Sequence, residues 1–214
     1  MAFVSAFPPS SLSSAHGRLP GISATRPPCL ATGQARMSVT APNTFKQALL
    51  EKVHPLNFGR DVADNPAEQL DIEQLARQVE ATNKSLSPGT DPNLSGVWDM
   101  VYTTSKSILA TGSPGFLQSR RIVQEINAAV LKGRNSETFR FGPLQFDNAV
   151  NFELNPASEK RFDVNFVEFV LLNFIRVNVR ENMRFTGWLE VTYLDEDLRI
   201  SRGNAGNLFI LIKK

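Results

Sequence analysis

After Leu94, apolar and polar side chains alternate with a period of two residues, and this alternation continues to the C-terminus. Such alternation is typical of strands with one buried and one solvated face. Turn residues interrupt it at hairpin spacing, as at Gly142-Pro143 and Asn155-Pro156. The pattern predicts nine strands, over residues 96–103, 120–130, 136–141, 144–154, 161–169, 175–180, 183–194, 198–202 and 207–212.

These short strands need an arrangement that leaves no exposed edge. Closure into a barrel removes edges altogether, so a mainly β fold is expected, an antiparallel up-and-down barrel of about eight strands. A sandwich of two sheets is the alternative.

Two helices are predicted before the strands. Residues 44–53 carry apolar side chains at helical spacing behind Asn43 or Thr44 as a possible N-cap. Residues 66–82 begin with Pro66, a favourable first-turn residue. The buried stripe of this second helix is predicted to contain Leu70, Ile72, Leu75, Ala76 and Val79. A helical segment and loop over 41–92 should therefore precede a barrel over 93–214.

The first 40 residues differ in composition from the rest. They are rich in Ser, Ala and Pro, and no Asp or Glu occurs before Glu51, whereas arginines do occur. This composition is typical of an organelle transit peptide, and a disordered tail is the alternative. Residues 1–40 are therefore interpreted as an organelle transit peptide, and the resemblance described below implies that the organelle is the plastid.

The inventory of reactive side chains excludes most catalytic chemistry. The chain of 214 residues contains one cysteine, Cys29, and two histidines, His16 and His54. These numbers exclude a disulfide framework and any multi-thiolate metal site within one chain. No glycine-rich phosphate loop is present, and the acidic stretch 195–197 is interpreted as a solvated turn. We therefore expect no enzyme activity, metal or cofactor.

Partners are constrained by charge and hydropathy. Cleavage near Arg36 would remove three of the 23 basic residues and none of the 21 acidic ones, which leaves 20 minus 21, or −1. A nearly neutral chain lacks the strongly basic footprint of a nucleic-acid-binding domain. The longest apolar run, residues 169–172, is far shorter than the roughly 20 residues that a membrane-spanning helix needs. Neither nucleic acid nor a transmembrane helix is expected.

The first strand opens with Gly96-Val97-Trp98, and spacing places Tyr102 on the face of Trp98. In a closed barrel the first and last strands are neighbours. Arg199 or Arg202 near the last strand could therefore lie over the Trp98 ring as a cation–π pair. The alternative is an ordinary core tryptophan with two solvated arginines.

Residues 167–175 (VEFVLLNFI) break the alternation with a dense apolar patch, unlike the usual polar hairpin turn. A strand buried on both faces beneath the helices is one explanation. The other is a lip that contacts lipid, for which Leu171, Leu172 and Phe174 are the candidates.

Two segments, 94–104 (LSGVWDMVYTT) and 187–211 (GWLEVTYLDEDLRISRGNAGNLFIL), resemble the plastid lipid-associated proteins, also called fibrillins or plastoglobulins. The resemblance covers about residues 43–212. It implies a lipocalin-like barrel in chloroplasts, at thylakoids or plastoglobules, that handles carotenoids, prenylquinones or fatty acids.

The leading hypothesis is a protein that carries or stores an apolar lipid inside the barrel. The candidate cavity residues are Trp98, Tyr102, Phe146, Phe152, Phe185, Leu189 and Tyr193, and the candidate closure residues are Gly96, Trp98, Arg199 and Arg202. The alternatives are a structural coat protein of plastoglobules without an internal ligand, or an accessory subunit of a prenyl-lipid enzyme. Apolar lipids and a thylakoid or plastoglobule surface are the expected partners.

Overall fold

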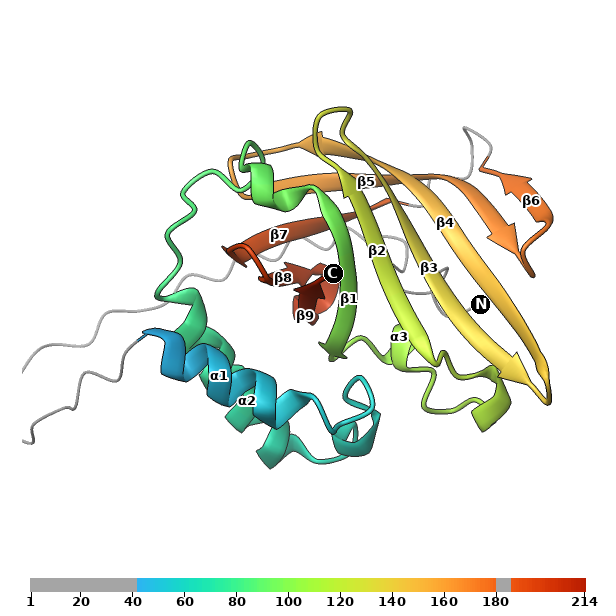
Figure 1. Cartoon of the computed structure of the whole chain (residues 1–214), viewed down its shortest axis with the longest axis horizontal. Coiled ribbons are helices and arrows are strands. Elements are labelled where there is room, and N and C mark those ends of the chain that lie inside the picture. The colour runs from blue at the N-terminus through green and yellow to red at the C-terminus, as the bar shows by residue number, and fades with distance from the viewer. Residues whose placement is uncertain (1–41, 180–185) are drawn as a thin grey trace, which may run out of the picture.

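Eight antiparallel strands close into a barrel in the computed structural model, which describes residues 42–179 and 186–214 (Figure 1). The predicted transit peptide, 1–40, and Phe185 lie outside the described residues. The barrel strands are β1 (Gly96–Thr103), β2 (Arg121–Asn127), β3 (Lys132–Phe141), β4 (Leu144–Pro156), β5 (Arg161–Leu171), β7 (Thr186–Leu194), β8 (Leu198–Gly203) and β9 (Leu208–Lys213).

Each barrel strand pairs with its neighbour in sequence, and β1 closes the circle against β9, with Met100 opposite Leu211. The strand β6 (Ile175–Asn178) does not enter the wall and forms a hairpin on the end of β5. The predicted up-and-down barrel is therefore confirmed, and the sandwich is excluded by the β1–β9 and β4–β5 pairings.

The two predicted helices are present as α1 (Pro42–Val53) and α2 (Pro66–Glu80). The side chain of Asn65 caps α2 by accepting a hydrogen bond from the Glu68 N–H. The prediction that Leu70 is buried was wrong, because Leu70 is 56% exposed. It precedes Ile72 by two residues and so points about 200° away from the buried stripe of Ile72, Ala76 and Val79.

Four short helical segments were not predicted, namely η2 (Arg60–Val62), η3 (Pro92–Leu94), η4 (Gly115–Leu117) and η5 (Asn204–Gly206), together with one α-helical turn, α3 (Lys106–Leu109). Three or four residues are too few to show helical periodicity. The segments α3 and η4 matter most for function, because they form the connection between β1 and β2.

Two apolar cores share the wall of the barrel. One lies inside the barrel around Trp98 and Phe152, and the other lies outside it, where α1 and α2 cover β8 and β9. Residues of β8 therefore alternate between the cores, with Leu198 and Ile200 in the outer one and Arg199 facing inward. The strands buried on both faces under the helices are β8 and β9, and not residues 167–175 as one explanation held.

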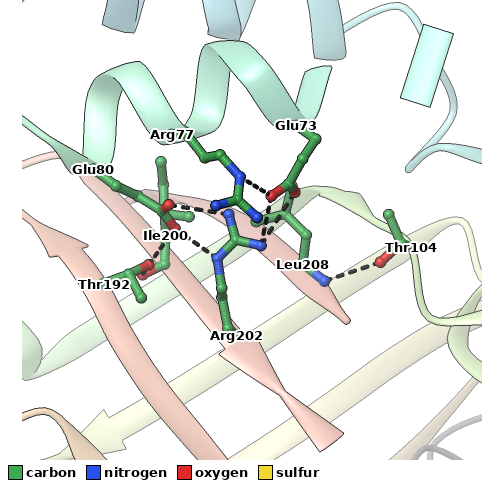
Figure 2. A network of polar contacts seen from close by, with 8 residues as sticks. All are labelled: Glu73, Arg77, Glu80, Thr104, Thr192, Ile200, Arg202 and Leu208. Carbon is green, nitrogen blue, oxygen red and sulfur yellow. Dashed lines mark hydrogen bonds and ion pairs between the residues drawn. The ribbon is translucent and has the colours of Figure 1, made fainter. Parts of the chain in front are cut away.

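A charged cluster fixes α2 to the barrel (Figure 2). The guanidinium of Arg202, on β8, makes two contacts with Glu80, from Nε to Oε1 at 2.9 Å and from Nη2 to Oε2 at 3.0 Å. Its Nη1 lies 3.0 Å from Glu73 Oε1, and the Thr192 hydroxyl donates to Glu80 at 2.6 Å. This cluster links α2 to the outer face of β7 and β8.

The turn between β7 and β8 fixes α1. Lys46 Nζ lies 2.7 Å from Asp195 Oδ2 and also contacts Asp197. Asp195 accepts further hydrogen bonds from the Tyr193 hydroxyl (2.6 Å) and the Leu198 N–H (2.8 Å). Burial by itself raises the pKa of Asp195, but these hydrogen bonds outweigh it and hold the pKa far below its usual range. The acidic turn is therefore an anchor for α1 and not merely a solvated loop.

We expect this anchor to weaken in acid. Because the folded-state pKa of Asp195 lies below its unfolded value of about 3.9, the stabilisation is present above that pH and is lost as the pH falls toward the folded pKa. Asp195→Asn should lower the free energy of unfolding by about 1–2 kcal/mol at neutral pH. Urea unfolding at neutral pH and near pH 3 checks this, since the difference from the unmodified protein should shrink in acid. A difference of equal size at both pH values would contradict the prediction.

Candidate functional site

The Trp98 ring lies in the inner core, in contact with two cations. It is fully buried, with the Arg199 guanidinium 4.9 Å and the Lys213 ammonium 5.2 Å from the ring centroid. Its indole N–H donates to the Leu94 carbonyl at 3.0 Å. Gly96 has a φ of +141°, a backbone conformation that favours glycine, and a Cβ there would lie 2.7 Å from the flexible Lys213 side chain, which would have to move.

Arg202, the second arginine considered for Trp98, lies elsewhere. It faces outward from β8 into the Glu73 and Glu80 cluster, three residues from Arg199 and therefore on the opposite face of the strand. Arg199 is the arginine that lies over the Trp98 ring.

Two predicted cavity residues, Tyr102 and Tyr193, point away from the barrel interior. The register of β1 against β9 shifts between Met100 and Tyr102, and that of β7 against β8 shifts between Val191 and Tyr193. Each irregularity inserts one residue and turns the following side chain to the other face. Both tyrosines therefore lie in the outer core beneath the helices, where burial raises the pKa of Tyr102 to about 12.

The remaining described candidates face inward at different levels of the barrel. Phe152 is buried and makes an edge contact with Phe166, with ring centroids 6.4 Å apart. Phe146 is half-buried and stacks on Phe139 at 5.8 Å. Leu189 is half-buried. Of the predicted cavity residues in the described part of the chain, Leu189 is the one that lines the cavity found inside the barrel.

This internal cavity has a volume of about 40 Å³. Since a buried water needs about 10–15 Å³, the space corresponds to roughly three water molecules. Its walls are mostly apolar, and its polar groups come from Gln124, Asn135, Arg199 and Ser201. The other lining residues are Met100, Ile108, Ile122, Val123, Leu189, Phe209 and Leu211.

Three buried polar atoms of residues that line the cavity have no hydrogen-bond partner within the protein. They are Nε and Nη1 of Arg199 and the hydroxyl oxygen of Ser201. The third guanidinium nitrogen, Nη2, donates to Gln124 Oε1, and Gln124 in turn donates to Asn135 Oδ1 at 2.8 Å. Burial lowers the pKa of Arg199 to about 9, so the guanidinium is still charged at neutral pH.

A second feature is an apolar rim at one end of the barrel. In an up-and-down barrel the β1–β2, β3–β4 and β5–β6 connections all lie at the same end. Eight of the thirteen exposed large apolar side chains in the described part of the chain belong to these connections or border them. We call these eight residues the apolar rim: Phe116, Leu117, Phe141, Leu144, Leu172, Phe174, Ile175 and Val177.

Contacts hold the parts of the rim together. The rings of Phe116, from η4, and Phe141, from the β3–β4 hairpin, meet edge to face at 5.5 Å. The segment that carries η4 is fixed by Arg60, which donates to the carbonyl oxygens of Leu109 (2.7 Å) and Ser119 (3.1 Å). In Figure 1 the short helix η4, which follows α3, lies next to the tip of the β3–β4 hairpin. The strand β6 lies at the end of β5, on the same side of the view.

The β5–β6 turn carries the three predicted lipid-surface residues. Contrary to expectation, the apolar patch forms a tight hairpin turn, in which Leu172 and Asn173 have φ values of +53° and +73°. Leu171 is half-buried, whereas Leu172 is 36% and Phe174 is 72% exposed. Hydrogen bonds to β4 support this turn, because the Asn173 side chain accepts from the Asp147 N–H at 2.6 Å and the Leu172 N–H donates to Asn148 at 3.1 Å.

Several of these residues were not found from the sequence. Ser201 lies two residues after Arg199 in the same strand, so its inward position follows once Arg199 is known to face inward. Phe141 and Leu144 flank the predicted Gly142-Pro143 turn. Apolar residues next to a turn could have indicated that apolar side chains are exposed at this end of the barrel. Lys213 gave no signal, because its contact with Trp98 depends on the register of β9.

None of the helices in the described residues could span a membrane, because each is too short or too polar. No group of three or more His, Cys, Asp or Glu side chains in residues 42–179 and 186–214 is arranged to hold a metal ion.

Comparison with known proteins gives consistent matches. The profile of the PAP/fibrillin family matches residues 43–212. A probable plastid-lipid-associated protein 5 from Arabidopsis thaliana is 40% identical over 78% of this chain and 68% of its own length. Plastid lipid-associated protein 3 from Brassica campestris is 29% identical and plastoglobulin-1 from Pisum sativum 28% identical, each over 79% of this chain. The chain spans 60% and 61% of the lengths of these two relatives. No solved structure gives a significant match.

Proposed function

This chain belongs to the PAP/fibrillin family of plastid lipid-associated proteins, and on that premise we propose that it binds plastid lipid surfaces through its apolar rim. The relatives are named as chloroplastic or chromoplastic proteins, and one is named a plastoglobulin. A plastoglobule or thylakoid surface is therefore the target that fits the chain. The protein acts as a peripheral structural component of that surface.

The observation that carries this proposal is the exposure of the rim. Phe174 is 72%, Phe141 59% and Leu144 55% exposed, and all lie at one end of the barrel. A concentrated apolar surface of this kind marks an interaction site, because water solvates it poorly. Insertion of such side chains into the boundary between headgroups and acyl chains gains free energy in proportion to the apolar area buried.

The cavity around Arg199 is too small to store a whole lipid. Sites for drug-sized ligands have volumes of about 300–1,000 Å³. The cavity of about 40 Å³ holds a group of a few atoms, and Trp98, Phe152 and Arg199 fill much of the remaining interior. A carotenoid or prenylquinone would need a large repacking of this core. The coat-protein alternative is therefore preferred to storage of a lipid in this cavity. A second hollow, of about 660 Å³, is open to solvent and has charged residues such as Lys132 and Glu153 in its lining, so it is not an enclosed apolar site.

The test is a double substitution at the hairpin tip, Leu172→Ser with Phe174→Ser. Each large apolar side chain that becomes buried contributes about 1.5–3 kcal/mol, so binding should weaken by at least about tenfold. Thermal stability should fall only modestly, because Phe174 is 72% exposed and Leu172, at 36% exposed, lies in a turn and outside the two apolar cores. Flotation with vesicles of phosphatidylcholine and phosphatidylglycerol, and with triacylglycerol droplets, measures the binding.

The control is Leu86→Ser with Val130→Ser. These residues are 75% and 57% exposed but lie outside the rim, Val130 in the β2–β3 turn at the opposite end of the barrel. This variant should float like the unmodified protein. Equal flotation of the rim variant and the control would refute the proposal.

A further inference from the structure

The three segments that carry the apolar rim contain basic residues and no acidic ones. Residues 104–121, 139–146 and 170–178 include all eight rim residues. They also include five basic side chains, all exposed, and neither Asp nor Glu. The five are Lys106, Arg120, Arg121, Arg140 and Arg176. The charge of these segments is therefore of a single sign.

Three of these cations have no ion pair within the described structure. Arg121 and Arg176 pair with carboxylates of β1 and β5, at 3.0 and 3.2 Å. The charged groups of the other three, Lys106, Arg120 and Arg140, have no carboxylate within 4 Å among residues 42–179 and 186–214. Exposed cations without a partner in the protein attract anions from outside it.

The acidic residues that flank the 139–146 segment are engaged by hydroxyl groups. Glu137 is buried and accepts a hydrogen bond from the Ser119 hydroxyl at 2.6 Å. Asp147 is half-buried and accepts one from the Thr138 hydroxyl, also at 2.6 Å. Neither carboxylate forms an ion pair with the rim cations, so the positive charge of the rim faces solvent.

The opposite end of the barrel carries charges of both signs. Its three turns lie within residues 126–133, 155–161 and 194–198, which contain four acidic and three basic residues. The barrel is therefore positive at the rim and mixed at the other end. Such an asymmetric charge distribution directs the rim toward a negatively charged surface.

We propose that the apolar rim recognises anionic lipid headgroups, so that negative charge at a lipid surface strengthens and orients binding. This inference rests on the proposed function, because the same rim side chains enter the lipid surface. Arg140 directly precedes Phe141 in the sequence. Arg176 lies between Ile175 and Val177. Long basic side chains lay their stems along apolar surface and keep their charged groups at headgroup level.

Vesicles that differ in headgroup charge test this inference. The full chain is floated with vesicles of phosphatidylcholine alone, and with vesicles of phosphatidylcholine and phosphatidylglycerol, at low salt. Each basic side chain near an anionic surface strengthens binding about fivefold, so three unpaired ones should give a preference of roughly 100-fold for the anionic vesicles. Salt at about 1 M should remove most of this preference, because it screens exposed charges.

A charge variant of the rim identifies the residues responsible. Lys106→Gln with Arg120→Gln and Arg140→Gln should lose most of the preference for phosphatidylglycerol. It should still float with triacylglycerol droplets, because the apolar rim is unchanged. Its thermal stability should hardly change, since all three side chains are exposed and unpaired in the described structure.

The matched control removes the same charge elsewhere. Lys84→Gln with Lys132→Gln and Lys160→Gln changes three basic residues outside the rim segments and should keep the preference. The basic residues before Glu51 are present in all of these proteins, so their contribution cancels in the comparison.

Two outcomes would overturn the inference. Equal binding to the two kinds of vesicle at low salt would do so, and would leave an acidic protein surface as the partner of these cations. An equal loss of preference in the rim charge variant and in the control would do so as well, because net charge alone would then explain the binding. Droplet flotation of Leu172→Ser with Phe174→Ser tests the apolar contact separately, so failure of this inference and failure of the proposed function are distinguishable.

Discussion

Trp98→Ala should lower the free energy of unfolding by about 3–5 kcal/mol, the largest effect expected of a single substitution in this protein. The side chain is fully buried in the inner core. Its removal leaves a cavity, deprives Arg199 and Lys213 of a cation–π partner and leaves the Leu94 carbonyl without the indole N–H. These losses affect β1, β8 and β9 together, so the strands that close the barrel should be destabilised as a unit.

Urea unfolding monitored by circular dichroism measures this effect. Val97→Ala is the matched control, since Val97 is the adjacent residue of β1 and its side chain is 37% exposed. The control should cost less than about 1 kcal/mol. A Trp98→Ala protein within about 0.5 kcal/mol of the unmodified one would show that the inner core does not depend on this residue.

Arg202→Ala should detach α2 from the barrel and lower stability by about 2–4 kcal/mol, somewhat less than breaking a fully buried ion pair because the side chains are 15–25% exposed. The substitution leaves the carboxylates of Glu73 and Glu80 without their shared cation. Arg202→Lys should recover only part of the loss, because an ammonium cannot reproduce the two-pronged contact with Glu80.

Hydrogen exchange locates this effect. Amides of α2 should lose protection in Arg202→Ala while those of β2 and β3 keep it. Arg77→Ala is the control, since the Arg77 side chain is 70% exposed and contacts only Glu73 of the same helix in the cluster. A double-mutant cycle of Arg202→Ala with Glu80→Ala should give a coupling energy above about 1 kcal/mol. Additive losses would show that the cluster does not hold the helix.

Local patterns were sufficient for the strands and the second helix. Residues 96–103 were predicted as a strand with the bounds of β1, and Asn65 with Pro66 marked the start of α2. Alternation and capping act between residues close in sequence, so these signals do not depend on the rest of the fold. Closure followed as well, because many short strands without closure would leave edges exposed.

The sequence did not predict which face of a strand a side chain takes after a shift in strand register. Regular alternation of side chains would place Tyr102 on the face of Trp98, and Tyr193 on the face of Leu189. One extra residue in each strand moves both tyrosines to the other face. Nothing in the local sequence marks these positions, because the irregularities arise from how β1 fits β9 and how β7 fits β8. The sequence also left open whether Arg199 or Arg202 lies over the Trp98 ring, because the face of each arginine depends on how β8 fits its neighbouring strands.

Local patterns in the sequence predicted a barrel with two preceding helices, and the segments 94–104 and 187–211 were sufficient to indicate its family. The interior of the barrel and its cover could be learned only from the folded structure. In it, Arg199 is buried inside the barrel, and the exposed residues of the apolar 167–175 segment lie in the apolar rim, not beneath α1 and α2. The physical reason is that burial and charge pairing depend on contacts between residues distant in sequence, whereas periodicity reports only which residues share a face.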